Sequence, residues 1–471
     1  MTLDEIVNSV QGEVVLQGEY SAFNDISIDT RNIKKEDIFI AIRGEKFNGN
    51  EYIKEASEKG ASVCIVDEVR YKNENIQKNT TVIKVNNTRE ALLDLAEYYR
   101  SKINVKIVGI TGSAGKTSTK DLVAAALSGK YKVFKTEGNL NNQIGLPLMI
   151  FKLNNSYDIA VLEMGMNNLN EIHTMAKAAR PDIALITNVG TAHIGNLGSR
   201  ENILKAKLEI TDFFDKKNTL IINGDNDLLS KIKKKIFEII KIGINDDVNF
   251  KAEDIDLGED FVEFSINEII QTSDEERKIL KERFRVDVPG KHSVLNALLA
   301  IACGKILGMK YEEIRLGFRN LQTTSMRLDI VKGNRFNIIN DCYNANPDSM
   351  KAAIDVLKNL KSKRKVAVLG TMGELGDESL DAHKSIGKYA MENGVNVLIT
   401  LGEFNKVYKE GFYSVESGKL TVESYKGFES QDEAIKYLIE ECLQEGDAVL
   451  IKASRAMKFE TIVEALKKSN C

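Results

Sequence analysis

Short apolar runs alternate with polar turns through the first part of the chain. The runs DIFIAI, ASVCIV and TVIKV are rich in Ile and Val, which predicts short strands. The stretch TREALLDLAEYYRSK follows, and Leu92, Leu95 and Ala96 recur in it at the spacing of one helix face. We therefore predict a small α/β domain over residues 1–85, followed by a helix that leads into a second domain.

A different pattern begins at about residue 86, where continuous apolar runs are each followed by a helical pattern. The runs are VKIVGITG, DIAVLEMG, DIALITNVG and NTLIINGD. This repeated order of strand, loop and helix predicts a parallel sheet covered on both faces. From about 228 to 288 the chain is charged and irregular, which we interpret as a peripheral β segment. We assign residues 86–325 to this central domain.

The same alternation returns after the stretch RLDIV, with FNIIND, KVAVLG, VNVLIT and DAVLIKAS as predicted strands. We assign residues 326–471 to a third domain of alternating strands and helices. A chain of 471 residues is too long for a single core, which agrees with three domains. Only four prolines occur in it, so we expect short joints between the domains.

Composition narrows the class of protein. The formal net charge of −4 gives no sign of a nucleic-acid partner. The sequence contains no apolar run of 18 or more residues, so we predict no membrane-spanning helix. The five cysteines lie far apart without a CxxC pair, which argues against a zinc cage or a disulfide framework. The start MTLDEIVNSV lacks the pattern of a secretory signal. We expect a cytoplasmic protein and a monomer.

The stretch GITGSAGKTSTK, residues 109–120, carries the clearest chemistry. A strand precedes it and a helix follows, so backbone N–H groups and the helix dipole form an anion site. Lys116 can reach terminal phosphates, and the Thr117 hydroxyl can bind Mg²⁺. The glycines follow GxxGxxGKT and not the usual GxxxxGK[ST], which leaves open a turn with a solvated lysine. The guanine-selecting NKxD sequence is absent, which argues against a switch protein.

Two further side chains follow predicted parallel strands. Glu163 ends DIAVLEMG and His193 comes after DIALITNVG, and the carboxyl ends of parallel strands face the ligand crevice. A carboxylate and an imidazole there could hold a metal over the phosphates. Taken singly, each could also be an ordinary strand-end or loop residue. The helix ENILKAKLEITDFF bears Lys205 and Lys207, and spacing alone predicts that both face solvent.

Together these stretches resemble the ATP-dependent Mur ligases of peptidoglycan synthesis. The resemblance rests on GITGSAGKT, TEGNLNNQIGLPL, LEMGMNN, NVGTAHIG, KAKLEI and NGDND, and it covers essentially the whole chain. SIDTR, DIFIAIRGEKFNGNEYI and DCYNANPDSM are similar to the members that add D-alanyl-D-alanine. The resemblance implies a UDP-binding first domain, a central ATPase domain and a Rossmann-like third domain. It also implies ligation of D-alanyl-D-alanine to UDP-MurNAc-tripeptide through an acyl phosphate.

Roles for individual residues follow from the resemblance. The implied catalytic residues are Lys116, Lys207, His193 and Arg327. The implied ATP contacts are Gly112, Ser113, Ala114, Gly115, Lys116, Thr117, Ser118, Asn296, Arg327, Asp341 and Tyr343. Two Mg²⁺ ions would be held by Thr117, Glu163, His193 and Lys207, the last as a carbamate formed with CO₂. The implied substrate contacts are Ser27, Thr30, Arg31, Arg43, Asn139, Asn142, Asn344 and Asn346.

The chain departs from the family pattern in two places. Asn340-Asp341 stands where a pair of aspartates is expected, and KASRAMK has Ala453 and Ala456 where glycines are expected. Both alanines fit if their φ angles are negative. Alternative functions are another Mur-type ligase with a different third domain, a folylpolyglutamate synthase, and a non-catalytic UDP-sugar binder with a relic ATP loop.

Overall fold

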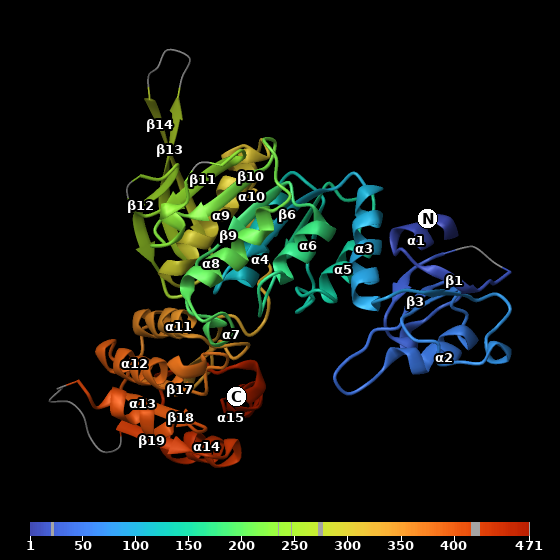
Figure 1. The fold of residues 1–471 in the computed structure, drawn as a ribbon. Coiled ribbons are helices and arrows are strands. Elements are labelled where there is room, and N and C mark those ends of the chain that lie inside the picture. The colour runs from blue at the N-terminus through green and yellow to red at the C-terminus, as the bar shows by residue number, and fades with distance from the viewer. Residues whose placement is uncertain (20–22, 234, 246, 272–276, 416–423, 471) are drawn as a thin grey trace.

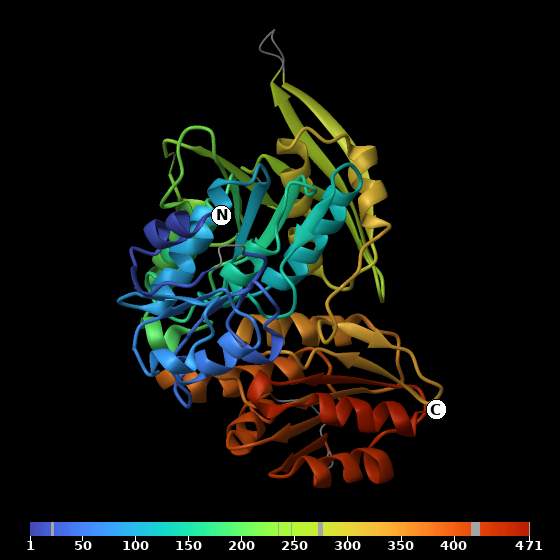
Figure 2. The same ribbon diagram turned by 90° about the vertical axis from the view of Figure 1, so that its right-hand side faces the viewer.

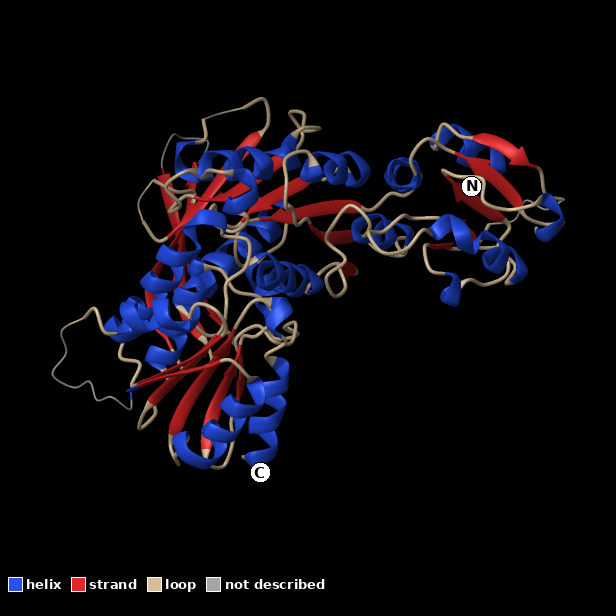
Figure 3. Cartoon of the chain, turned by 60° about the horizontal axis from the view of Figure 1, so that its bottom comes forward, coloured by secondary structure: helices blue, strands red, loops and turns tan. Residues whose placement is uncertain are grey.

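The chain forms three sheets, each with its own helices, arranged in sequence order (Figure 1). The structure is a computed structural model, and it describes residues 1–19, 23–233, 235–245, 247–271, 277–415 and 424–470. The central part lies between the other two, and the first part points away from the third (Figures 1 and 3). No helix among the described residues combines the length and apolar character needed to cross a membrane.

The first sheet has five strands in the order β1-β5-β4-β3-β2, parallel except for β1. Its buried strands come from the apolar runs of the sequence. The elements of this part are α1 Leu3–Ser9, β1 Glu13–Leu16, β2 Ile26–Ser27, β3 Ile38–Ile40, α2 Ile53–Glu58, β4 Val63–Val66 and β5 Thr81–Lys84.

The second sheet has nine strands in the order β14-β13-β12-β11-β10-β9-β6-β8-β7. It is parallel from β12 to β7, and β12, β13 and β14 pair antiparallel. The elements are α3 Thr88–Ser101, β6 Lys106–Thr111, α4 Lys116–Ser128, β7 Val133–Lys135, α5 Gly145–Phe151, β8 Ile159–Glu163, α6 Glu171–Ala179, β9 Ile183–Ile186, α7 Ile194–Leu197, α8 Arg200–Leu208, β10 Thr219–Asn223, β11 Glu238–Gly243, β12 Phe250–Leu257, β13 Val262–Gln271, β14 Arg277–Val286, α9 Lys291–Ile306 and α10 Tyr311–Phe318.

The segment 228–288 was expected to be β and peripheral. It is β, but it continues the central sheet as β11 to β14 (Figure 1). Residues 272–276 within it lie outside the described part of the chain.

The third sheet has six strands in the order β15-β16-β20-β17-β18-β19, parallel except for β15. It lies below the central part in Figure 2. The elements are β15 Asp329–Val331, β16 Phe336–Asn340, α11 Pro347–Asn359, β17 Lys365–Leu369, α12 Ser379–Glu392, β18 Val397–Leu401, α13 Asn405–Phe412, β19 Tyr425–Phe428, α14 Gln431–Tyr437, β20 Asp447–Lys452 and α15 Glu460–Ser469.

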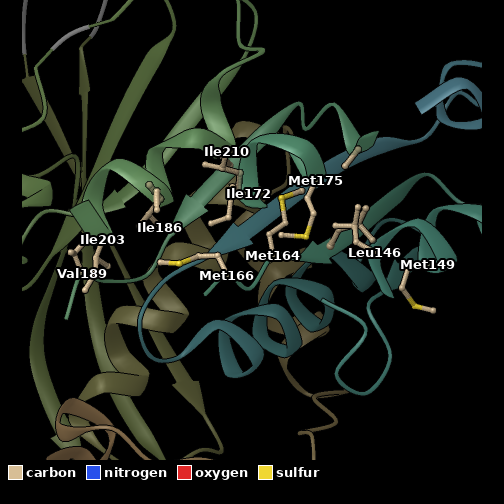
Figure 4. Close-up of a cluster of buried hydrophobic side chains, with 14 of the residues drawn as sticks. Leu146, Met149, Met164, Met166, Ile172, Met175, Ile186, Val189, Ile203 and Ile210 are labelled. Atoms are coloured by element: carbon tan, nitrogen blue, oxygen red, sulfur yellow. The ribbon is translucent and has the colours of Figure 1, made fainter. Parts of the chain in front are cut away.

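The central sheet is covered on both faces, which explains why its strands read as continuous apolar runs. On one face, α6 places Ile172, Met175 and Ala179 at helical spacing against Met164 and Ile186 (Figure 4). On the other face, α4 and α9 pack in a second buried cluster. Complete burial of each large aliphatic side chain contributes about 1.5–3 kcal/mol to stability, so the two helical layers fix the positions of the central strands.

Helix α10 packs so closely on α4 that a glycine is needed between them. A Cβ added at Gly317 would lie 2.2 Å from the carbonyl oxygen of Ala125 and 2.5 Å from that of Ala126. Both contacts are to backbone, which cannot rotate away as a side chain can.

We therefore predict that Gly317→Ala lowers the free energy of unfolding of the central domain by about 1–3 kcal/mol through overpacking. Thermal unfolding should show a melting temperature several degrees lower. Leu316→Ala is the matched control, because Leu316 lies on the same helix and is 51% exposed. Equal melting temperatures for Gly317→Ala and the control would contradict this packing.

Candidate active site

The carboxyl ends of three neighbouring parallel strands meet at one edge of the central sheet. Ile110 of β6 is paired with Glu163 of β8, and Thr111 of β6 is paired with Ile186 of β9. The loops that follow these strands therefore start side by side. Glu163 is the last residue of β8, and the loops after β6 and β9 carry the glycine-rich turn and His193, as the sequence predicted.

The glycine-rich turn is shaped by close backbone approaches. Gly112 has φ +156°, and an added Cβ there would lie 1.8 Å from Thr187 Oγ1. Gly115 has φ +79° and directly precedes α4. Asn188 Oδ1 accepts hydrogen bonds from the N–H groups of Ser113 and Ala114, at 3.1 and 2.8 Å. The turn thus leads into the N-terminus of α4, whose first N–H groups lack acceptors within the helix and suit an anion.

Lys116 and Thr117 begin α4 and meet Glu163. Lys116 Nζ donates to the carbonyl oxygen of Gly112 at 2.8 Å. Burial lowers the pKa of Lys116, and the nearby Glu163 carboxylate opposes this shift. Thr117 Oγ1 donates to Glu163 Oε2 at 3.0 Å, and Asn141 Nδ2 donates to Oε1 at 2.8 Å. A hydroxyl and a carboxylate held together in this way are suitable ligands for Mg²⁺.

His193 lies across the same cavity, on the loop after β9. Its backbone is left-handed, with φ +66°, and it precedes α7. Its Nδ1 lies 2.6 Å from Oε2 of Glu374, which belongs to the third domain. The contact with His193 lowers the pKa of Glu374. Among the described residues, no group of three or more His, Cys, Asp and Glu side chains is arranged to hold a metal ion, so a cation here would also need the Thr117 hydroxyl or other oxygen ligands.

Lys207 is buried, and the prediction from spacing that it faces solvent is wrong. Its relative exposure is 1%, whereas Lys205 on the same helix is exposed. Lys207 follows Ile203 and Ala206 on the buried side of α8, at the spacing of one helix face. No hydrogen bond or ion pair to Nζ is found among the residues described. Burial, followed by the charge of Lys116, lowers the pKa of Lys207 far below its usual value.

The third domain contributes Arg327 and Tyr343 to the site. Arg327 Nη2 donates to Thr117 Oγ1 at 3.2 Å, and its guanidinium lies 4.1 Å from the centre of the Tyr343 ring. Asn346 Nδ2 donates to the carbonyl oxygen of Ser113 at 3.3 Å. The glycine-rich turn is therefore contacted directly by the third domain.

Two cavities meet at this turn. The larger, of about 310 Å³, brings together most of the predicted residues: Ser113, Ala114, Gly115, Lys116, Thr117, Asn139, Asn142, Glu163, His193, Arg327, Tyr343, Asn344 and Asn346. The smaller, of about 140 Å³, is lined by Ala114, Gly115, Ser118, Asn296, Arg327 and Asp341, among others. Tyr343 lines the larger cavity and not the smaller, so its implied contact with ATP stays a prediction. Lys207 lines neither cavity.

The predicted substrate residues of the first domain lie elsewhere. Arg31 is exposed and forms a forked ion pair with Asp29, from Nε at 2.9 Å and from Nη2 at 2.6 Å. Arg43 is paired with Asp67 and Glu68.

Ser27 and Thr30 belong to the same turn as Arg31. Ser27 Oγ donates to the carbonyl oxygen of Asp29 at 3.0 Å, and Thr30 is buried. None of the four first-domain residues lines the two cavities described above.

Several residues of the site were missed by sequence reasoning. Asn188 lies near the end of the predicted strand DIALITNVG, and Asn141 lies between two asparagines that were named, so their positions gave a usable signal. Glu374 follows the predicted strand KVAVLG but contacts the site only across a domain boundary. Ala453 and Ala456 are not among the described residues with positive φ, so both fit without strain.

Comparison with known proteins identifies the class. Residues 23–100 match the model of the Mur ligase family, catalytic domain, residues 110–304 match the Mur ligase middle domain, and residues 326–455 match the Mur ligase, glutamate ligase domain. The chain belongs to the Mur ligase family.

Within that family the chain is similar over its full length to D-alanyl-D-alanine-adding ligases. It is 36% identical to UDP-N-acetylmuramoyl-tripeptide--D-alanyl-D-alanine ligase of Bacillus subtilis (strain 168), over 99% of this chain and 98% of the relative. A crystal structure of MurF from Acinetobacter baumannii superposes with a TM-score of 0.88 at 29% identity, covering 99% of this chain and 98% of that one. MurF ligase from Thermotoga maritima, solved in complex with ADP, superposes with a TM-score of 0.80 at 26% identity, covering 95% of this chain and 97% of that one.

The linker that carries Arg327 is anchored to α4 by a buried carboxylate. Asp121 Oδ2 accepts from the backbone N–H of Thr324 at 2.8 Å and from its hydroxyl at 2.7 Å. Asp121 Oδ1 lies 2.7 Å from Lys135 Nζ. Asp121 therefore links the helix that begins at Lys116 to the joint between the domains.

We predict that Asp121→Asn lowers the free energy needed to open this linker by about 1–3 kcal/mol, because the amide supplies only one acceptor oxygen and no charge for Lys135. Trypsin should then cleave after Arg327 at least about 5-fold faster, since cleavage follows the population of the open form. Asp94→Asn is the control, because it removes a more exposed pair, with Lys177, worth under about 1 kcal/mol. Cleavage at the wild-type rate would show that Asp121 does not hold the linker.

Proposed function

We propose that this protein is an ATP-dependent ligase that joins D-alanyl-D-alanine to UDP-N-acetylmuramoyl-tripeptide, giving the pentapeptide precursor of peptidoglycan. The observation that carries the proposal is the convergence of Lys116, Thr117, Glu163 and Arg327 on one cavity between two domains. The full-length similarity to ligases of this name supports the choice of substrates. Because the reaction consumes ATP, we place it in the cytoplasm. The domain limits 1–85, 86–325 and 326–471 belong to the same proposal.

In this proposal the nucleotide lies along the glycine-rich turn. The triphosphate would rest on the N-terminus of α4, with Lys116 at its end and Arg327 reaching it from the linker. The smaller cavity, which contains Asn296 and Asp341, lies beside the turn and suits the adenosine. The relative from Thermotoga maritima was solved in complex with ADP, which supports an adenine nucleotide as the ligand.

The residues present fit divalent cations. The Thr117 hydroxyl and the Glu163 carboxylate are 3.0 Å apart, and His193 lines the same cavity. We propose that they hold two Mg²⁺ ions, as the ligands of Mg²⁺ are chiefly oxygens. When bound, the ions would offset the repulsion between the triphosphate and the substrate carboxylate.

The proposed chemistry has two steps. First, a carboxylate oxygen of the tripeptide attacks the γ-phosphorus, the bond to the β-phosphate oxygen breaks, and ADP leaves. Lys116 and Arg327 balance the charge that moves in this step. Next, the amine of D-alanyl-D-alanine attacks the acyl carbon, an amide bond forms and phosphate leaves, with loss of a proton from nitrogen. Because an acyl phosphate hydrolyses readily, the third domain that covers the cavity would also exclude water.

We also propose that Lys207 is carbamylated. Burial lowers the pKa of Lys207, which favours the neutral amine, and the Nζ lone pair of that amine can bond to the carbon of CO₂ with loss of one proton. The adduct is an anion, which suits a position beside Lys116 and two cations. The absence of a partner for Nζ among the described residues supports this proposal.

For the first domain, we propose that Ser27, Thr30, Arg31 and Arg43 bind the UDP part of the substrate. Arginine binds phosphate through charge-assisted and often bidentate hydrogen bonds. Arg31 would have to exchange its bonds to Asp29 for bonds to phosphate, and its exposure makes that exchange possible.

The decisive experiment is product formation from UDP-MurNAc-tripeptide, ATP and Mg²⁺. We expect ADP and the pentapeptide product to appear only when D-alanyl-D-alanine is present. Lys116→Ala should lower turnover at least about 100-fold, because it removes charge stabilisation of the transition state. Lys106→Ala, an exposed lysine on the preceding strand, is the control. Turnover with another amino-acid acceptor and none with D-alanyl-D-alanine would refute the assignment.

The carbamate gives a separate prediction. Lys207→Ala should nearly abolish ligation, and formate or acetate should restore part of it by supplying a carboxylate. Lys207→Arg should remain inactive, because arginine keeps the positive charge and cannot form the adduct. Lys205→Ala, on the exposed side of the same helix, should behave as wild type. Near-normal activity of Lys207→Arg would rule out the carbamate.

A further inference from the structure

A loop of the third domain, residues 371–376, docks against the start of α7 in the central domain. Gly195 N–H donates to the carbonyl oxygen of Glu374 at 3.2 Å. A Cβ added at Gly376 would lie 2.9 Å from the Cα of Gly195, so the two backbones touch. In the same contact, Oε2 of Glu374 lies 2.6 Å from Nδ1 of His193.

The loop is held firmly by its own domain. His383 on α12 is fully buried and stacks on Phe404, with ring centres 3.9 Å apart. Its Nε2 accepts a hydrogen bond from the backbone N–H of Met372 at 2.9 Å, and its Nδ1 lies 2.6 Å from the carbonyl oxygen of Ser379. Glu374 has φ +65° just beyond this anchor. The Glu374 carboxylate is therefore presented by the third domain and moves with it.

The Glu374 carboxylate lies close enough to His193 to influence which ring nitrogen carries the proton. A carboxylate beside Nδ1 favours the tautomer with the proton on Nδ1, and leaves the lone pair on Nε2. No described residue makes a hydrogen bond to Nε2. His193 lines the cavity that also contains Lys116, Thr117 and Glu163. Histidines that bind metals usually donate their other N–H to a carboxylate or carbonyl, and Glu374 is a carboxylate within reach of Nδ1 here.

We propose that Glu374 is a positioning residue for the cation at His193, and that through it cation binding is coupled to docking of the third domain. The Glu374 carboxylate, whose Oε2 lies 2.6 Å from Nδ1, favours the ring state that leaves Nε2 free for the ion. Because this carboxylate comes from the third domain, the His193 site is complete only when that domain is docked. By linkage, the cation must in turn stabilise the docked arrangement. The inference rests on the proposed function, in which His193 binds one of two cations.

The test is Mn²⁺ binding to the whole protein, followed by electron paramagnetic resonance with a non-hydrolysable ATP analogue. Wild type should bind two ions. Glu374→Gln should lower the affinity for one of the two ions about 10–100-fold, the usual effect of losing a group that orients a metal ligand. His193→Gln should lower the affinity for the same ion. The double variant should bind that ion no more weakly than His193→Gln alone. Glu378→Gln, an exposed carboxylate two residues beyond the docked loop, is the control and should bind as wild type.

Small-angle scattering gives the second readout. Saturating Mn²⁺ should compact the wild-type complex and should compact Glu374→Gln less. Unchanged binding of both ions by Glu374→Gln would overturn the proposal, as would additive losses in the double variant, because Glu374 would then act apart from His193. If the wild-type protein forms the pentapeptide product but His193→Gln binds both Mn²⁺ ions with unchanged affinity, the role given to Glu374 fails while the ligase function stands. If no product forms, the proposed function itself fails.

Discussion

The site depends on the parallel pairing of β6 with both β8 and β9. In a parallel sheet the strands end at the same edge, and here the register brings Ile110 beside Glu163 and Thr111 beside Ile186. This pairing places the glycine-rich turn between a carboxylate on one side and the His193 loop on the other. A slip of one residue along β8 would turn the Glu163 side chain to the opposite face of the sheet. The buried layers on both faces make such a slip costly.

The joint between the central and third domains is strained as well as anchored. Met326 and Leu328 have φ angles of +62° and +51°, so both neighbours of Arg327 are left-handed without being glycine. Such residues persist only where the surrounding structure fixes them, and they occur often at functional sites. Here Asp121 fixes the chain before Arg327, and Asp341 fixes it after by accepting the N–H of Leu328 at 3.2 Å. The strain therefore coincides with the point at which an arginine enters the nucleotide cavity.

Much of this arrangement could be predicted from the sequence, because the signals are local. Buried parallel strands read as continuous apolar runs, and the position of Glu163 at the end of one such run was enough to place it. Lys207 was misplaced although its signal was present. Ile203 lies four residues before Lys207 and Ala206 directly before it on α8, while Ile210 lies three residues after it; all three are buried, so the lysine occupies an apolar stripe.

Other features could not be predicted, because they depend on contacts between distant parts of the chain. No spacing relates Glu374 to His193, since the two lie in different domains and meet only when those domains dock. The same holds for Asp121 and Thr324, which are separated by most of the central domain. The segment 228–288 was recognised as β from its composition, but its place in the central sheet depends on pairing with β10 and could not be read from the segment alone.

Docking of the third domain relies heavily on main-chain atoms of the central domain. Asn346 bonds to the carbonyl oxygen of Ser113, the carbonyl oxygen of Glu374 accepts from Gly195, and Gly376 rests on Gly195 itself. All residues except proline carry both a backbone carbonyl and an N–H, so these hydrogen bonds constrain few central-domain side chains apart from Gly195, where an added Cβ would lie 2.8 Å from the nitrogen of Gly376. Third-domain surfaces that face the incoming amine could therefore diverge while the joint stayed intact. The same nucleotide-binding central domain can therefore be combined with third domains that bind different acceptors.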